Sequence, residues 1–212
     1  APQRLVLNGA DAVVTVSETT KKQMLEHRLT KRPITVIYNA ADAAEVVLER
    51  DNSRSRILVY MGSFIGYKNV EALIMGVALL PEHTLVCLSR ISEARRGELT
   101  QLAKSVGASV QFENGVSEAE YHQWLIEAQA LVTASKDEGF GIPVIEAMER
   151  GTPAIVSSLE IFQEIGSDAA MYFNPSDPQS FADQVNSLAK TDSWLSTSKK
   201  SIAQAAKFSW RK

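Results

Sequence analysis

Short apolar runs alternate with longer amphipathic segments along almost the whole of this 212-residue chain. Runs of a few residues rich in Val, Ile and Leu are typical of buried strands, whereas longer segments with apolar residues three and four positions apart are typical of helices. The predicted strands cover residues 12–16, 34–37, 57–61, 84–88, 110–112, 130–133 and 154–157. The predicted helices follow residue 17 and cover 70–80, 93–105, 118–128, 143–150, 161–165, 177–189 and 193–208. This alternation predicts βα units and a doubly wound parallel sheet of the α/β class.

Composition and charge narrow the classes of function. The 22 basic and 25 acidic residues give a net charge of −3, which offers no electrostatic footprint for nucleic acid. No apolar segment approaches the 18 residues of a membrane span. Cys87, the only cysteine, lies in an apolar run, so we expect a core residue and no disulfide. The expected location is therefore the cytoplasm.

The segment from Glu138 to Ala147 carries the strongest signal for chemistry, because it places two carboxylates, Glu138 and Glu146, around a Gly-rich turn directly after a predicted strand. Pro143 suits the first position of a helix, where its missing N–H costs nothing. The N–H groups at such a helix start attract phosphate, and glycines let the backbone approach it. A Gly-x-Gly turn alone would equally suit a plain strand-to-helix connection. With both carboxylates, the segment predicts a ligand that carries phosphates and hydroxyls, such as a nucleotide sugar. Its candidate binding residues are Glu138, Gly139, Phe140, Gly141, Ile142, Pro143, Val144 and Glu146.

This string resembles the E-x7-E motif of retaining glycosyltransferases of family 4, also called group 1. The resemblance implies the Rossmann-like C-terminal half of a GT-B fold. Residues 10–18 are similar to the last strand of the family's N-terminal acceptor domain, and residues 36–42 to its hinge, from which Tyr38 and Ala40 depart. It thus implies that residues 1–39 are the end of that domain plus the hinge, and that residues 40–212 form the donor-binding domain.

The loop from Gly62 to Asn69 is similar to the family's G-R-x4-K-G diphosphate loop. Lys68 matches the lysine, whose ammonium would sit against the leaving diphosphate. Ser63 stands where most members have arginine, although its hydroxyl retains one hydrogen bond for a phosphate. Taken without the neighbouring motifs, Lys68 is better interpreted as an ordinary solvated residue ahead of a helix.

Two further segments are candidates for contact with the nucleoside. Residues 112–117 match a family segment whose backbone contacts the base, which places Gly115 and Val116 there. Arg90 follows the strand over 84–88 and either stacks on the base, reaches a phosphate or is an exposed loop residue. Because main-chain groups read the base, uridine and guanosine both stay open.

By resemblance, the full enzyme transfers a hexose, with mannose favoured, from a UDP- or GDP-linked sugar to an acceptor glycan or lipid-linked saccharide. Configuration is retained, and surface polysaccharide of the O-antigen kind is the expected product. The resemblance assigns the donor's hydroxyls to Glu138 and the ribose to Glu146, with Glu138 and Lys68 serving catalysis and no metal or cofactor needed. The acceptor and a family histidine belong to an N-terminal domain outside this chain. We therefore expect the chain to bind donor but turn over poorly, and the full protein to touch the inner face of the cytoplasmic membrane.

Other classes of protein remain open. A GT-B nucleotide-sugar epimerase would bind the same donor and need no acceptor. A phosphorylase would use orthophosphate and normally pyridoxal phosphate, for which no lysine motif is evident. A non-catalytic nucleotide-sugar-binding module is the third alternative, and such a module would tolerate the loss of Glu138 and Glu146.

Overall fold

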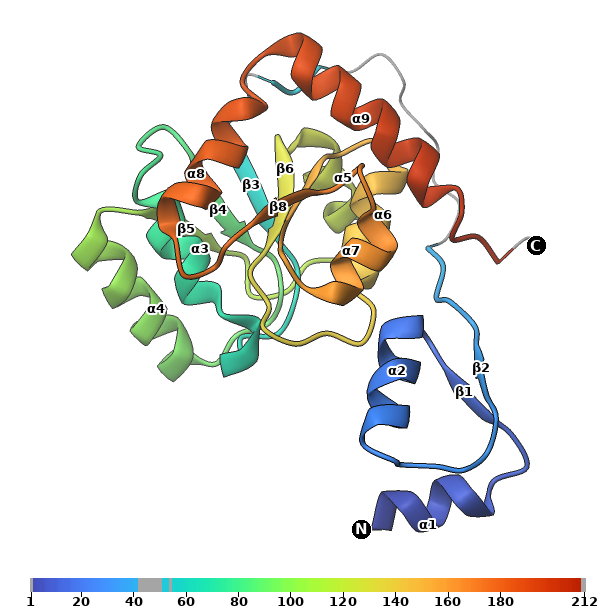
Figure 1. Cartoon of the computed structure of the whole chain (residues 1–212). Helices are drawn as coiled ribbons and strands as arrows, with labels where there is room; N and C mark the ends of the chain where they lie inside the picture. Colours follow the sequence, from blue (N-terminus) through green and yellow to red (C-terminus); the bar gives the residue numbers. More distant parts are fainter. Residues whose placement is uncertain (1, 42–50, 54, 211–212) are drawn as a thin grey trace.

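A computed structural model describes residues 2–41, 51–53 and 55–210. In the described residues, six strands form one sheet in which every neighbouring pair is parallel (Figure 1). The strands are β3 (Ile57–Tyr60), β4 (Thr84–Cys87), β5 (Ser109–Phe112), β6 (Ala130–Thr133), β7 (Ala154–Ser157) and β8 (Met171–Phe173). This confirms the predicted doubly wound α/β sheet.

The order of the strands decides where a ligand can bind. Across the sheet they run β5-β4-β3-β6-β7-β8, so the chain first winds outward from β3 and then returns to place β6 on the other side of it. The connections that leave β3 and β6 therefore diverge to opposite sides. In such sheets the ligand crevice lies at this switch point, outside the carboxyl ends of the two central strands.

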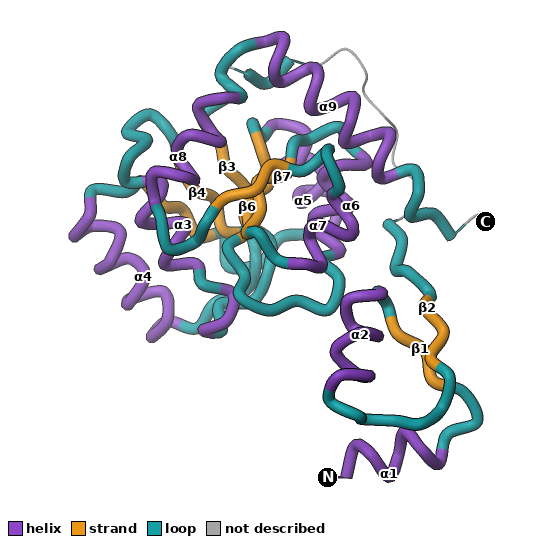
Figure 2. Tube along the Cα trace, in the orientation of Figure 1, coloured by secondary structure: helices purple, strands orange, loops and turns teal. Residues whose placement is uncertain are grey.

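Helices cover both faces of the sheet (Figure 2). Because successive strand residues point to opposite faces, Leu58 and Tyr60 pack against one set of helices and Val59 against the other. The first set is α3 (Val70–Val77), α4 (Glu93–Val106) and α8 (Pro178–Ser187). The second set is α5 (Glu118–Glu127), α6 (Ile142–Glu149) and α7 (Glu160–Gly166). The long helix α9 (Thr191–Ala205) belongs to both cores, through Trp194 at one end and Ala205 at the other.

A small N-terminal unit precedes the sheet. It contains α1 (Pro2–Gly9), β1 (Val13–Thr15), α2 (Glu18–Glu26) and β2 (Ile34–Val36), and its two strands pair in parallel. Helix α2 packs against α7, and the Tyr38 ring meets Phe208 edge-on at 5.5 Å between centroids. Figure 1 shows the C-terminal end of the chain returning to this junction. The unit therefore sits against the larger domain near the carboxyl end of its sheet.

One local prediction is confirmed, because Cys87 is fully buried in the core. Ser117 and Glu120 form a capping box at the start of α5, and Gly107 caps α4 in a left-handed conformation. Of the predicted hinge over residues 36–42, only residue 42 lies outside the described residues. The domain boundary between residues 39 and 40 stays a prediction.

Other local predictions are wrong or incomplete. Helix α6 begins at Ile142, which puts Pro143 at its second position; the proline still needs no N–H there. Three elements were not predicted, namely α1, the single 3₁₀ turn η1 (Gly66–Lys68) and β8. Both η1 and β8 have only three residues, too few for a periodic pattern, and β8 is defined by its pairing with β7. Within the part of the chain that is described, no helix combines the length and the apolar character needed to cross a membrane.

Candidate functional site

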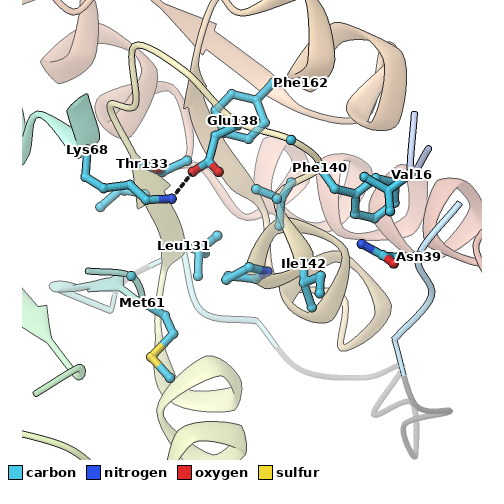
Figure 3. A pocket seen from close by; sticks show the side chains of 16 residues that line it. Val16, Asn39, Met61, Lys68, Leu131, Thr133, Glu138, Phe140, Ile142 and Phe162 are labelled. Atoms are coloured by element: carbon cyan, nitrogen blue, oxygen red, sulfur yellow. Dashed lines mark hydrogen bonds and ion pairs between the residues drawn. The ribbon is translucent and has the colours of Figure 1, made fainter. Parts of the chain in front are cut away.

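A cavity of about 350 Å³ opens at the switch point between β3 and β6 (Figure 3). That volume falls in the range of small-molecule sites. Residues from the ends of β3 and β6, the start of α6 and the N-terminal unit form its wall. The sequence-predicted site residues that line it are Gly62, Lys68, Glu138, Gly139, Phe140, Gly141, Ile142, Pro143 and Val144. The remaining candidates, Ser63, Arg90, Gly115, Val116 and Glu146, do not line it.

Lys68 and Glu138 meet across the cavity. The lysine Nζ lies 2.5 Å from the Glu138 Oε1, and each side chain keeps only 15% of its surface exposed. The turn η1 carries Lys68, and Asn69 ends it in the left-handed conformation, with φ of 53°. The Asn69 side-chain amide donates to the carbonyl of Ala134 at 3.3 Å, which ties this turn to the end of β6. A cation and an anion are thereby held at the two sides of the switch point.

Two serines fix the Glu138 carboxylate. Ser135 donates from its Oγ to Glu138 Oε1 at 2.9 Å, and the Ser135 carbonyl accepts from Ser157 Oγ at 2.6 Å. These serines follow β6 and end β7, and both are buried. Neither serine was among the predicted site residues. Their place at the carboxyl ends of adjacent strands was the available signal, because parallel strands bring such residues together.

The Gly-rich loop leaves backbone donors free. In the described residues, no acceptor partners the N–H of Gly139, Phe140, Gly141 or Ile142. The sequence expectation extended this free set to Val144 and requires a correction. Pro143 has no N–H, and the N–H of Val144 donates to the Gly141 carbonyl at 2.9 Å, as the first turn of α6 tightens. The free donors therefore lie before and at the start of the helix.

Gly141 determines the shape of this loop. Its φ is 98°, a conformation that L side chains rarely adopt, and it caps the N-terminus of α6. A Cβ added there would lie 2.7 Å from Cε1 of Phe162, a fully buried ring. The loop can therefore pass close to α7 only with glycine at this position.

Glu146 lies one turn into α6 but outside the cavity. Its Oε2 accepts from the hydroxyl of Tyr121 on α5 at 2.8 Å. Burial and the Glu146 carboxylate raise the pKa of Tyr121, so its hydroxyl stays protonated as a donor. Arg150 donates to the Glu146 carbonyl at 3.0 Å and so bonds to the backbone of the same turn. One carboxylate oxygen of Glu146 is thus positioned by a buried partner that the sequence did not indicate.

The segment predicted to contact the nucleobase contains two residues with positive φ. Asn114 and Gly115 have φ of 56° and 101°, and the Gly115 N–H donates to the Leu88 carbonyl at 3.0 Å. Arg90 is exposed and its stem packs beside Gly115, while Val116 is half-buried against the core. Arg90 follows β4, and Gly115 and Val116 follow β5, so all three lie at the carboxyl ends of these neighbouring strands.

The diphosphate-loop candidates show how the loop after β3 is held. The Tyr60 hydroxyl donates to the Ser63 carbonyl at 2.6 Å, and the Gly62 N–H donates to Ser89 Oγ at 3.0 Å. Ser63 itself is exposed. The backbone donor of Gly62 is therefore occupied, and Lys68 supplies the positive charge of this loop to the cavity.

The N-terminal unit also contributes to the cavity wall. Val16 and Asn39 line it, and Figure 3 shows both on the N-terminal part of the chain, facing the Gly-rich loop. Neither was a predicted site residue. In the sequence, only their membership of the strand and hinge segments that flank the donor domain pointed toward them.

Comparison with known families agrees with this architecture. The family model described as "Glycosyl transferases group 1" matches residues 47–208, and the model described as "Glycosyltransferase Family 4" matches residues 1–45. The chain belongs to the group 1 glycosyl transferases. This confirms the family that the E-x7-E segment suggested, and the doubly wound domain is the Rossmann-like half of a GT-B fold.

Curated relatives of this group 1 chain include two mannosyltransferases. The O-antigen chain mannosyltransferase RfbU of Salmonella typhimurium is 28% identical over 179 residues, covering 83% of this chain and 50% of the relative. The GDP-mannose:cellobiosyl-diphosphopolyprenol alpha-mannosyltransferase of Xanthomonas oryzae pv. oryzae is 26% identical over 186 residues, covering 83% of this chain and 49% of the relative. The chain thus spans about half the length of these relatives.

A solved structure shares the fold of the group 1 chain. Anabaena Alr3699/HepE in complex with UDP and glucose superposes with a TM-score of 0.82 at 19% identity, covering 97% of this chain and 61% of that one. The likeness includes the N-terminal unit as well as the sheet domain, since nearly the whole of this chain is covered.

Proposed function

We propose that this chain forms the donor site of a glycosyltransferase that transfers a hexose from a nucleoside diphosphate sugar with retention of configuration. The observation that carries the proposal is the meeting of Lys68 and Glu138 in a cavity that is also lined by residues 139–142, whose N–H groups have no acceptor in the described residues. A diphosphate needs positive potential, and sugar hydroxyls need acceptors. The cavity supplies both within a short distance.

Lys68 and the loop N–H groups would stabilise the diphosphate as it leaves. Positive charge and aligned backbone donors act on the charge that develops in the transition state, where their effect is larger than in water. The N–H groups of Gly141 and Ile142 lie at the positive end of the α6 dipole. We propose that these groups suffice without a metal, which the titration below tests with and without Mg²⁺.

The two motif carboxylates would bind hydroxyls of the donor. When the diphosphate takes Lys68 as its partner, Glu138 becomes free to accept from sugar hydroxyls while Ser135 keeps it in place. Glu146 would accept from the ribose with the oxygen that Tyr121 does not use. In this proposal Glu138 orients the sugar, and its role differs from that of a hydrolase carboxylate pair.

The curated relatives support mannose as the transferred sugar and a surface polysaccharide as the product. One is named an O-antigen chain mannosyltransferase, and another is named for its GDP-mannose donor. We propose that the full protein acts on a glycan or lipid-linked saccharide at the inner face of the cytoplasmic membrane. GDP-mannose is therefore the first donor to test, with UDP-glucose beside it.

Calorimetric titration of the chain with GDP, UDP, ADP and their sugar conjugates, with and without Mg²⁺, tests the donor site. We expect one nucleotide family to bind without the metal and Glu146→Ala to weaken it by about 10-fold, the loss of charge-assisted hydrogen bonds. Glu127→Ala is the control: this exposed carboxylate on α5 accepts a hydrogen bond from Gln123 of its own helix, so its loss changes the charge equally and should leave the affinity unchanged.

Two outcomes would contradict this proposal. Binding that requires Mg²⁺ would overturn metal independence. Interconversion of one nucleotide sugar into another, with no acceptor present, would identify an epimerase instead of a transferase.

Tyr121→Phe tests the positioning of Glu146. The phenylalanine keeps the buried ring but removes the donor to Oε2, so Glu146 loses its fixed orientation. We expect the affinity for the nucleotide to fall by about 3- to 10-fold, the range of one hydrogen bond. Tyr172→Phe is the matched control, because the Tyr172 hydroxyl bonds to the backbone carbonyls of Ser167 at 2.7 Å and Phe162 at 3.2 Å and contacts neither carboxylate of the motif. Equal loss in both variants would assign the effect to stability.

A further inference from the structure

The Glu164 carboxylate of α7 caps a helix of the N-terminal unit. It accepts from the N–H of Glu18 at 2.7 Å and from the N–H and Oγ1 of Thr19 at 2.8 and 2.6 Å, all in the first turn of α2. Burial acts to raise the pKa of Glu164, but the hydrogen bonds from Thr19 and Glu18 outweigh it and lower the pKa. An ionised carboxylate at a helix N-terminus stabilises that helix and, here, joins two parts of the chain.

The same first turn of α2 contacts the Gly-rich loop. Ser17, the N-cap of α2, is fully buried and accepts from the N–H of Thr20 at 3.0 Å. Two acceptors lie within reach of its single hydroxyl proton, Thr20 Oγ1 at 2.8 Å and the carbonyl oxygen of Gly139 at 3.1 Å, and Thr20 Oγ1 is a second donor to that carbonyl at 3.4 Å. Between them, the two hydroxyls at the start of α2 thus hold the carbonyl of one peptide in the donor loop.

Because of peptide geometry, this contact also sets the direction of an N–H group in the donor loop. A trans peptide is planar, and its C=O and N–H point in opposite directions. Holding the Gly139 carbonyl toward α2 therefore turns the Phe140 N–H away from α2. Gly139 and Phe140 both line the cavity, and the Phe140 N–H has no acceptor in the described part of the chain.

We infer that Glu164 is a positioning residue for the donor site, which acts through α2 and Ser17 to orient the Gly139–Phe140 peptide. The inference rests on the proposed function for its consequence, namely that the oriented N–H receives the donor's diphosphate. The N-terminal unit would then do more than carry part of an acceptor site. By docking on α7, it would also complete the backbone geometry of the donor loop.

A second link between α2 and α7 provides a matched control. Lys22 forms an ion pair with Glu160 at 2.6 Å, but both side chains are more than half exposed and neither leads to the loop. Such exposed pairs contribute little to stability. Glu160→Gln therefore removes an ion pair between the same two helices while leaving Ser17, Thr19 and Gly139 as they are.

The experiment measures two properties of the 212-residue chain and its variants Glu164→Gln, Ser17→Ala and Glu160→Gln. The first is affinity for GDP-mannose and, in parallel, for UDP-glucose. The second is the backbone order parameter of Phe140 and Gly141 from NMR relaxation without ligand. For Glu164→Gln and Ser17→Ala we expect affinity to fall by about 10-fold and the order parameters to drop from about 0.85 toward 0.6. Glu160→Gln should change neither, and Ser17→Thr, which keeps a hydroxyl, should retain more affinity than Ser17→Ala.

The two readouts separate this inference from the proposed function. If the unmodified chain binds no nucleotide sugar, the proposed function fails, and the order parameters alone decide whether Glu164 orders the loop. Unchanged order parameters in Glu164→Gln would overturn the inference, as would an equal drop in Glu160→Gln. A mobile loop with unchanged affinity would overturn its link to donor binding.

Discussion

Lys68→Ala is expected to weaken binding of both GDP-mannose and GDP by roughly 10- to 100-fold, the range of a charge-assisted hydrogen bond to phosphate. The lysine is the charged side chain of the 61–69 loop that reaches the cavity, and Glu138 holds it there at 2.5 Å. Removing it also leaves the Glu138 carboxylate without its cation, beside the position of an anionic ligand. Repulsion then adds to the lost attraction. Titration calorimetry of the variant measures the change directly.

Glu138→Gln should behave differently from Lys68→Ala, although the two residues form one pair. The glutamine frees Lys68 and removes a negative charge, so GDP should bind as well as before or better. GDP-mannose should lose its advantage over GDP, because the acceptor for sugar hydroxyls is weakened. Lys136→Ala serves as the charge control for Lys68→Ala, since this exposed lysine lies in the same loop as Glu138 but does not line the cavity. Parallel losses for GDP in the Lys68 and Glu138 variants would contradict the separate roles.

Gly141→Ala is expected to damage both stability and binding. The left-handed φ of 98° and the 2.7 Å approach of a Cβ to Phe162 together cost roughly 2–4 kcal/mol of unfolding free energy. For a chain of this length, thermal denaturation should show a fall in Tm of about 5–15 °C. The loop N–H groups move with Gly141, so donor affinity should fall even well below the new Tm.

Gly139→Ala, two residues earlier, is the matched control for stability. A Cβ on Gly139 would meet no atom within 4 Å, and this glycine does not have a positive φ. Its Tm should stay within about 2 °C of the unmodified chain, as for a substitution without a strained contact. A similar loss of Tm in both variants would mean that the positive φ and the close contact at Gly141 are not the cause of the fall in stability.

The regular part of the fold was open to prediction from the sequence because its signals are local. A strand such as 130–133 is buried on both faces, so it is apolar throughout, and the capping box at Ser117 needs only two residues three apart. The short elements were not open to prediction in this way. β8 exists because β7 offers it an edge, and η1 is held in place by Asn69 and the end of β6.

The same distinction between local signals and tertiary partners applies to the candidate site. Glu138, Lys68 and the glycines lie in contiguous motifs, so their residue types and spacing point to phosphate and hydroxyl chemistry. Ser135, Ser157 and Tyr121 carry no motif, because a serine or tyrosine becomes a positioning residue only through the partner that it meets. Glu164 is the clearest case, since nothing near it in the chain shows that its carboxylate caps a helix 145 residues away.

By itself, the sequence determined the α/β class of this protein, its membership of a family through one loop, and the kind of ligand that this loop suits. Each of these depends on neighbours along the chain. The tertiary structure alone decided which groups meet. Lys68 pairs with Glu138, Glu146 accepts a hydrogen bond from Tyr121, and hydroxyls at the start of α2 hold the Gly139 carbonyl. The physical reason is that strand order and helix packing, set by burial of the whole core, bring together groups whose separation in sequence carries no information about their distance in space.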